Sequence, residues 1–184
     1  KRTSDNLINI QNLVIDIDSH NKNVSIEEIH NQISNIIPKL INCLSIKPNF
    51  INETGRGLQL WYCIEPCHVS LKKVCINAIT MICDDIEKVL KDETLLKIDK
   101  ASSSKLSGLF RFPYSYNTKS KTWSKCQLIH KQTPNINTII STLSENGYNR
   151  KKIGNYKTKS KGKRNYKFNT YSKTNKYTPC LIHR

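Results

Sequence analysis

The sequence predicts an α+β domain with a largely antiparallel sheet packed by helices, and three observations support this fold class. Strand-like and helix-like segments mix between residues 13 and 145. Two of the strand-like segments are joined by a short glycine turn, which is typical of an antiparallel hairpin. A chain of 184 residues is long enough to bury one good core. We expect one domain over residues 1–147, followed by a basic tail over residues 148–184.

The first strand is expected over residues 13–18, where an apolar run ends in Asp16 and Asp18. Successive side chains of a strand alternate between its two faces. The two aspartates therefore share one face, while the odd-numbered apolar residues share the other and face the core. Ser25 then starts a capping box, and isoleucines at helical spacing predict a helix that ends at Pro38.

A hairpin is expected next, with a short strand over 48–53, a tight turn over 54–57 and an apolar strand over 58–64. Apolar residues at helical spacing then predict the longest helix over residues 69–90. Asp84 and Asp85, near its end, are expected on its solvated side. The remaining elements are expected to be a polar loop at 101–105, a strand at 123–130 and a last helix at 135–145.

Positive charge is concentrated in the second half of the chain. The formal net charge of +16 comes from residues 101–184, which contain 18 Lys or Arg and one acidic residue. The tail has few aliphatic residues and is not expected to fold alone. Its basic side chains are expected to contact phosphates, and its tyrosines, of which Tyr148 is the first, to stack on unpaired bases. The tail residues assigned to nucleic-acid binding are Lys151, Lys152, Tyr156, Lys157, Lys159, Lys161, Lys163, Arg164 and Tyr166. The alternative is a tail that only keeps the protein soluble or leads to a further domain.

The cysteines indicate a reducing compartment. Seven cysteines without a compact repeated spacing do not resemble a disulfide framework, and no N-terminal apolar leader is present. We therefore expect a cytoplasmic protein with no membrane partner.

Asp16 and Asp18 are the most informative residues for chemistry. Two carboxylates this close repel each other and resist ionising together, unless a hard divalent cation such as Mg²⁺ or Mn²⁺ neutralises them. Such a pair is typical of a metal-assisted reaction site. The alternative is that both aspartates only end the strand and start the loop over 19–23.

Three separated segments together resemble the archaeo-eukaryotic primase superfamily, in particular the small primase-polymerase domains in replication proteins of plasmids, phages and integrative elements. These segments are the strand ending in Asp16 and Asp18, the turn and strand over 54–59, and Asp99 followed by residues 111–119. The resemblance covers residues 10–130 as a pattern of ordered motifs. It implies a catalytic core with an RRM-like sheet.

The resemblance also implies roles for individual residues. Asp16, Asp18 and Asp99 would be catalytic and would hold two Mg²⁺ or Mn²⁺ ions. The nucleotide-binding residues that it implies are Thr54, Gly55, Arg56, Gly57, Gln59, Arg111, Asn117 and Lys119. Two positions depart from the family pattern, because Gln59 stands where a histidine is expected and Tyr114 where a glycine is usual. Glutamine donates hydrogen bonds but carries no charge, which predicts weaker nucleotide binding or slower transfer.

The function implied is template-directed nucleotidyl transfer, as a DNA primase and DNA polymerase in the replication of a plasmid, phage or mobile element. The partners would be a single-stranded DNA template, an NTP or dNTP, and a helicase domain or subunit. Two alternatives stay open. One is a non-catalytic primase-like module of a replication initiator, which Gln59 favours, and the other is a metal-dependent nuclease that uses the same aspartates.

Overall fold

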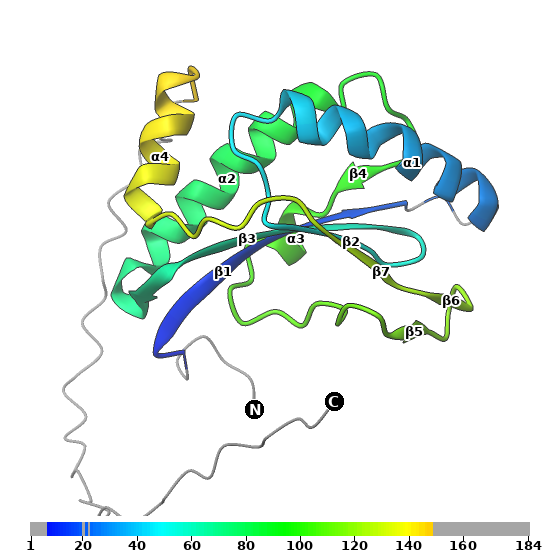
Figure 1. Cartoon of the computed structure of the whole chain (residues 1–184), viewed down its shortest axis with the longest axis horizontal. Coiled ribbons are helices and arrows are strands. Elements are labelled where there is room, and N and C mark those ends of the chain that lie inside the picture. The colour runs from blue at the N-terminus through cyan, green and yellow to red at the C-terminus, as the bar shows by residue number, and fades with distance from the viewer. Residues whose placement is uncertain (1–6, 20, 22, 149–184) are drawn as a thin grey trace, which may run out of the picture. The chain divides into compact units, whose positions relative to one another are not determined.

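A five-stranded antiparallel sheet with helices on one face forms the centre of the computed structural model, which describes residues 7–19, 21 and 23–148 (Figure 1). Its strands, in the spatial order β4-β1-β3-β2-β7, are β1 (Asn9–Asp18), β2 (Phe50–Glu53), β3 (Gly57–His68), β4 (Lys97–Ile98) and β7 (Lys125–Leu128). A separate two-stranded ribbon pairs β5 (Tyr116–Asn117) with β6 (Thr122–Trp123). The helices are α1 (Ile26–Cys43), α2 (Lys72–Val89), α3 (Lys100–Ser103) and α4 (Ile136–Glu145), and a 3-10 turn, η2 (Val69–Leu71), precedes α2. The predicted α+β class with a largely antiparallel sheet is confirmed.

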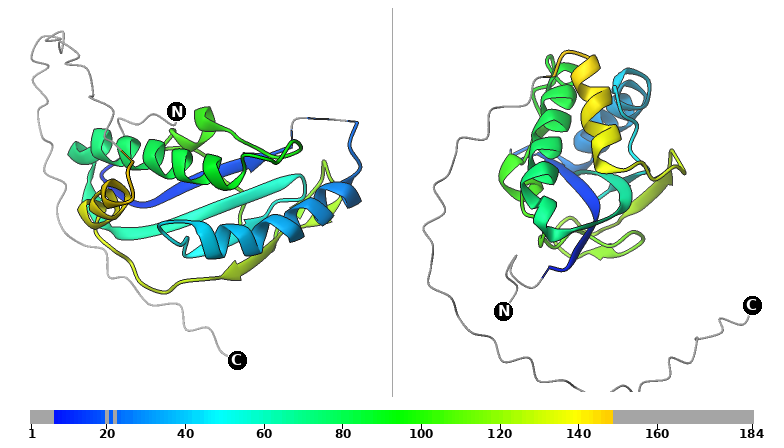
Figure 2. Two further views of the ribbon diagram at one scale, coloured as in Figure 1. Left: turned by 90° about the horizontal axis from the view of Figure 1, so that it is seen from above. Right: turned by 90° about the vertical axis from the view of Figure 1, so that its left-hand side faces the viewer.

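The two faces of the sheet have different coverings. Helices α1, α2 and α4 lie on one side, while the segment that carries β5 and β6 runs along the other (Figures 1 and 2). On β1, Leu13, Ile15 and Ile17 are fully buried in the core that the helices close. Asp16 and Asp18 alternate with them and point to the other face, as the strand pattern predicts. We call this second side the open face of the sheet.

Helix α1 does not end at Pro38, as the sequence analysis expected, but continues to Cys43. A proline inside a helix removes one backbone hydrogen bond and introduces a local clash. Leu40, beyond the proline, is completely buried and extends the apolar face formed by Ile29, Ile33 and Ile36. Core packing by this last part of α1 therefore outweighs the local cost of Pro38.

The region after β4 also differs from its prediction. Residues 101–105 were expected to form a polar loop, but Lys100–Ser103 form the short helix α3. Asp99 is its N-cap, with the Ser102 amide donating to one carboxylate oxygen at 2.9 Å and the Ser102 hydroxyl to the other at 2.8 Å. A capping aspartate satisfies amides that a helix leaves unpaired at its start, which explains why this short serine-rich segment becomes helical.

Asp85 was expected on the solvated side of the long helix, and this expectation is wrong. Its side chain is buried, with 5% of the residue exposed. The carboxylate accepts hydrogen bonds from the Ser45 amide at 2.8 Å, the Ser45 hydroxyl at 3.2 Å and the Tyr148 hydroxyl at 2.6 Å. Three donors replace the water that the carboxylate loses on burial, which makes its position tolerable.

Tyr148 belongs to the folded unit and not to the tail. It is 8% exposed, and Lys88 Nζ lies 3.9 Å from the centre of its ring. It is therefore not available to stack on an unpaired base. The nucleic-acid contacts assigned to Lys151, Lys152, Tyr156, Lys157, Lys159, Lys161, Lys163, Arg164 and Tyr166 lie outside the described residues. Among the helices that the structure describes, none is long and apolar enough to span a membrane.

Candidate active site on the open face of the sheet

The register of the sheet brings polar residues from three strands into one row on the open face, beside Cys126 of a fourth strand. Asp16 of β1 is opposite Gln59 of β3, Gln59 is opposite Asn52 of β2, and Asn52 is opposite Cys126 of β7. Directly opposite residues in antiparallel strands have Cβ atoms about 5 Å apart. Asp18, two residues further along β1, is opposite Gly57. The register therefore places both carboxylates beside the turn between β2 and β3.

Gly57 makes room for the Asp18 side chain. A Cβ atom at position 57 would collide with the Ile17 carbonyl oxygen and with a carboxylate oxygen of Asp18. The family resemblance implies a nucleotide-binding role for this glycine. In the structure, the space that a side chain at position 57 would need is occupied by the Ile17 carbonyl and the Asp18 carboxylate.

We expect Gly57→Ala to displace the Asp18 carboxylate and to lower the free energy of unfolding by about 1–3 kcal/mol, as overpacking in a tight site does. Chemical denaturation measures the free energy of unfolding, and a titration with metal or nucleotide measures the affinity of the cavity for that ligand. Gly147→Ala is the control for loss of stability alone, because Gly147 has a φ of +87°, which strains an alanine, and does not line the cavity. Equal loss of ligand binding in both variants would contradict the proposed role of Gly57.

The turn over 54–57 is held by the segment that leads into and carries β5 and β6, residues 109–123, which we call the open-face segment. Asn117 is buried, and its side-chain amide donates to the Thr54 carbonyl at 2.7 Å while its Oδ1 accepts from the Lys119 amide at 3.1 Å. Gly55 has a φ of +105°, a conformation that glycine adopts readily. Asn117 therefore positions the turn and the start of the Lys119 segment relative to each other.

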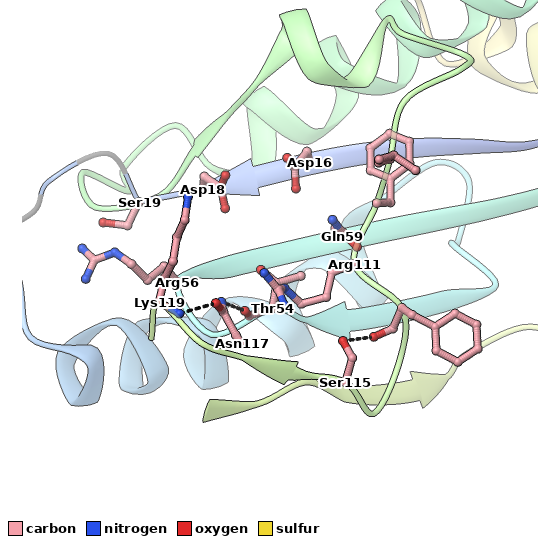
Figure 3. A pocket seen from close by; sticks show the side chains of 13 residues that line it. Asp16, Asp18, Ser19, Thr54, Arg56, Gln59, Arg111, Ser115, Asn117 and Lys119 are labelled. Carbon is pink, nitrogen blue, oxygen red and sulfur yellow. Dashed lines mark hydrogen bonds between the residues drawn. The ribbon is translucent and has the colours of Figure 1, made fainter. Parts of the chain in front are cut away.

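A cavity of about 510 Å³ lies between this segment and the sheet (Figure 3). Asp16 and Asp18 line it from β1, and Arg56, Arg111 and Lys119 line it from the turn and the open-face segment. Its other lining residues are Ser19, Thr54, Gln59, Leu109, Phe110, Phe112, Ser115 and Asn117. Two carboxylates and three cationic side chains thus meet around one cavity. Of the site residues expected from the sequence, Gly55, Gly57 and Asp99 do not line it.

Gln59 is in contact with Asn52 of the neighbouring strand. Asn52 is fully buried, and its amide donates to Gln59 Oε1 at 3.4 Å and to the Arg111 carbonyl at 3.0 Å. Because Gln59 accepts through its oxygen, its amide nitrogen is left to face the Asp16 side of the cavity (Figure 3). Gln59 therefore offers a neutral N–H donor to the cavity.

Asp99 lies next to Asp16 in the backbone but not in the cavity. Its amide donates to the Asp16 carbonyl at 2.8 Å, while its carboxylate caps α3. Within the described ranges, no group of three or more His, Cys, Asp or Glu side chains is arranged to hold a metal ion. Of the three aspartates expected to hold metal, Asp16 and Asp18 line the cavity and Asp99 does not, while its backbone lies beside Asp16.

The remaining donor set fits one hard divalent cation. Mg²⁺ is commonly bound by one or two protein carboxylates together with water and substrate phosphates. Asp16 and Asp18 supply the carboxylates on one face of β1. The Ser19 hydroxyl lines the same cavity, is buried, and has no hydrogen-bond partner among the described residues, so it adds an oxygen at the site. Oxygen donors of this kind suit Mg²⁺ or Mn²⁺ better than a softer metal.

Sequence reasoning missed the aromatic side of this site. Phe110 and Phe112 line the cavity, and Phe110 packs edge-on against Trp61 of β3, with ring centroids 5.9 Å apart. The signal was present in the sequence, because aromatic residues occupy every second position from 110 to 116. The chain turns at Tyr114, whose φ is 59°, so only Phe110 and Phe112 of these rings line the cavity.

The fold and the cavity define an α+β protein with paired carboxylates facing basic side chains on the open face of an antiparallel sheet. No protein-family model matches the sequence, and no curated protein matches it. Among solved structures, the chain is similar to the AEP domain of the primase-polymerase of cyanophage S-2L, with 8% sequence identity and a TM-score of 0.49. The alignment covers 77% of this chain and 64% of that one, so the chain spans less than two thirds of the domain that it matches. At this level of similarity, the functional argument rests on the site's own residues.

Proposed function

We propose that the cavity binds a nucleoside triphosphate with a divalent cation and that the chain adds nucleotides to a strand paired with a single-stranded DNA template. The observation that carries this proposal is the meeting of Asp16 and Asp18 with Arg56, Arg111 and Lys119 around one cavity. Carboxylates alone would repel a triphosphate, and cations alone would bind it without a place for a metal. The two sets together suit a metal-bound triphosphate.

Each side of the cavity has its own task in this reaction. Asp16 and Asp18 hold the cation, which when bound neutralises the triphosphate and makes the attacking 3′-hydroxyl more acidic. Arg111 and Lys119 bind phosphate oxygens and stabilise the charge that develops on the leaving pyrophosphate. Arg56 donates one N–H to the Asn21 carbonyl at 2.7 Å, which fixes its guanidinium at the cavity while other N–H groups remain for phosphate. Gln59 donates its amide to a phosphate oxygen.

Strand synthesis on a single-stranded DNA template tests the proposal. The full chain is incubated with Mg²⁺ or Mn²⁺ and with ribonucleotides or deoxynucleotides, with and without a primer, and products are resolved by length. We expect longer strands that depend on the metal and disappear with a chelator. Shortened strands would indicate a nuclease, and no change of length under any of these conditions would contradict a catalytic role.

A second candidate function is a primase-like module that binds nucleic acid without catalysis. The specific observation in its favour is that Asp99 does not join Asp16 and Asp18 in a three-ligand group within the described residues. This candidate predicts DNA binding that falls steeply with salt and is unchanged by substitution of either aspartate. The first proposal predicts triphosphate binding that depends on a metal, and this second candidate does not.

A further inference from the structure

Large aromatic side chains are exposed on the open-face segment, beside the candidate active site. The exposed fractions are 79% for Phe112, 70% for Tyr114, 66% for Trp123 and 45% for Tyr116. Tyr116 and Trp123 pack on each other across the ribbon, with ring centroids 5.4 Å apart. Exposed aromatic residues that gather in this way are uncommon on a protein surface and mark binding sites.

Two of these rings form the roof of a groove of about 440 Å³, which we call the aromatic groove. Its floor is the sheet row of Trp61, Phe50 and Leu128, which are opposite one another on β3, β2 and β7. Phe112, Pro113 and Tyr114 line it from above. This row is two residues from the row that contains Asp16 and Gln59, or about 7 Å along the strands. Phe112 lines both the cavity and the groove, so the two are adjacent.

Hydrogen bonds fix the backbone at Phe112 and the ring of Tyr114. The Phe112 carbonyl accepts from the Ser115 hydroxyl at 2.6 Å and from the Ser124 hydroxyl at 3.1 Å. The Tyr114 hydroxyl donates to the Cys126 carbonyl of β7 at 3.1 Å, and Tyr114 has a φ of 59°, which non-glycine residues seldom adopt. The groove is therefore a formed feature of the fold, with its roof tied to the edge strand.

The charge of the chain segment that contributes to the groove indicates what the groove binds. Residues 105–128 contain five basic residues, Lys105, Arg111, Lys119, Lys121 and Lys125, and no acidic one. Aromatic faces carried by a segment rich in cationic side chains suit a polyanion whose units have flat, stackable rings, which describes a single-stranded nucleic acid. A second copy of the chain fits poorly, because a formal net charge of +16 opposes self-association.

We propose that the aromatic groove stacks unpaired bases of a single-stranded nucleic acid, with Phe112 and Tyr114 as the stacking residues. Arg111 and the nearby lysines contact the phosphates of that strand. The inference rests on the proposed function for one point only, the identity of the strand as the template. It requires neither metal binding nor turnover, so binding experiments test it separately.

The test compares two dye-labelled strands of equal length, oligothymidine and an abasic deoxyribose-phosphate strand. Their affinities for the full chain are measured by fluorescence anisotropy in moderately high salt, which weakens contacts made only with phosphate. The ratio of the two affinities isolates the contribution of the bases. Stacking of bases on an aromatic side chain contributes to affinity whatever the base, so its loss is measurable as a change in this ratio. We therefore expect Phe112→Ala to lower this ratio about tenfold and Phe112→Tyr to preserve it.

Controls keep the result specific. Ile8→Ala removes an equally exposed apolar side chain outside the groove and is expected to leave the ratio unchanged, since Ile8 is 72% exposed. Oligouridine in place of oligothymidine shows whether the groove takes RNA as well as DNA. Asp16→Asn with Asp18→Asn is expected to leave the ratio unchanged, so that failure of catalysis and failure of the groove are distinguishable.

Three results would overturn the inference. The first is an equal effect of Phe112→Ala on both strands, and the second is no effect on either. The third is concentration-dependent self-association in sedimentation experiments that Phe112→Ala removes, because it would make the groove an interface between copies of the chain.

Discussion

Replacing Asp16 or Asp18 by asparagine is expected to reduce template-directed strand growth by about 1,000-fold, which corresponds to about 4 kcal/mol of transition-state free energy. Asparagine keeps the size of the side chain but removes the negative charge that would hold a divalent cation. Both residues line the cavity on the open face and not the apolar core. The fold is therefore expected to persist, which circular dichroism and thermal unfolding check.

The matched control is Asp92→Asn. Asp92 is exposed in the turn after α2 and does not line the cavity, so its replacement is expected to leave strand growth within about twofold of the unmodified chain. Full activity in both single variants, Asp16→Asn and Asp18→Asn, would mean that nucleotide transfer does not occur in the cavity. Equal losses in all three variants would point to an effect of charge on nucleic-acid binding.

Replacing Asp85 by alanine is expected to lower the free energy of unfolding by about 3 kcal/mol. The carboxylate accepts three hydrogen bonds, and its loss would leave the Ser45 amide and the Tyr148 hydroxyl without their acceptor. A buried donor without a partner costs about 1–3 kcal/mol. Chemical denaturation at neutral pH measures the change.

The neighbouring Asp84 provides the comparison. Its side chain is 36% exposed, and its contact with Lys100 is long, at 3.7 Å. Ion pairs of this exposed kind contribute about 0–1 kcal/mol, so Asp84→Ala is expected to have little effect. A similar loss of stability in both variants would contradict the structural role assigned to Asp85.

Tyr148→Phe removes only one of the three donors to Asp85 and is expected to cost about 1 kcal/mol at neutral pH. Burial, and then the hydrogen bond to Asp85, raise the pKa of Tyr148 above its ordinary value of 10.0. The folded state therefore resists loss of this proton more than the unfolded state does. Stability is retained below pH 10 and declines as the pH rises through the raised pKa. Tyr148→Phe is expected to make that alkaline decline shallower.

The spacing of apolar residues along the sequence predicted the strand β1 and the helix α2. The alternation along residues 13–18 predicted which face of β1 carries Asp16 and Asp18, and the spacing of apolar residues predicted α2. Local rules failed where distant residues decide the outcome. Pro38 is tolerated because α1 packs beyond it, and Asp85 is buried because Ser45 and Tyr148 reach it from other elements.

The sequence predicted the charged residues that line the candidate site, but not the contacts that position them. The sequence pointed to Asp16, Asp18, Arg111 and Lys119, which the structure brings to one cavity. It could not show that Gly57 accommodates Asp18, because that contact depends on the register between β1 and β3. Nor could it show that the carboxylate of Asp99 caps a helix, since α3 itself was not expected.

The most direct test of the central claim is the binding of a non-hydrolysable nucleoside triphosphate analogue by calorimetry, with Mn²⁺ or with a chelator. The claim is that Asp16, Asp18 and the basic side chains opposite them hold a metal-bound triphosphate. We expect binding to the full chain that requires Mn²⁺ and is at least about tenfold weaker when both aspartates are asparagine. Binding of equal strength with the chelator, or in the doubly substituted chain, would contradict the account.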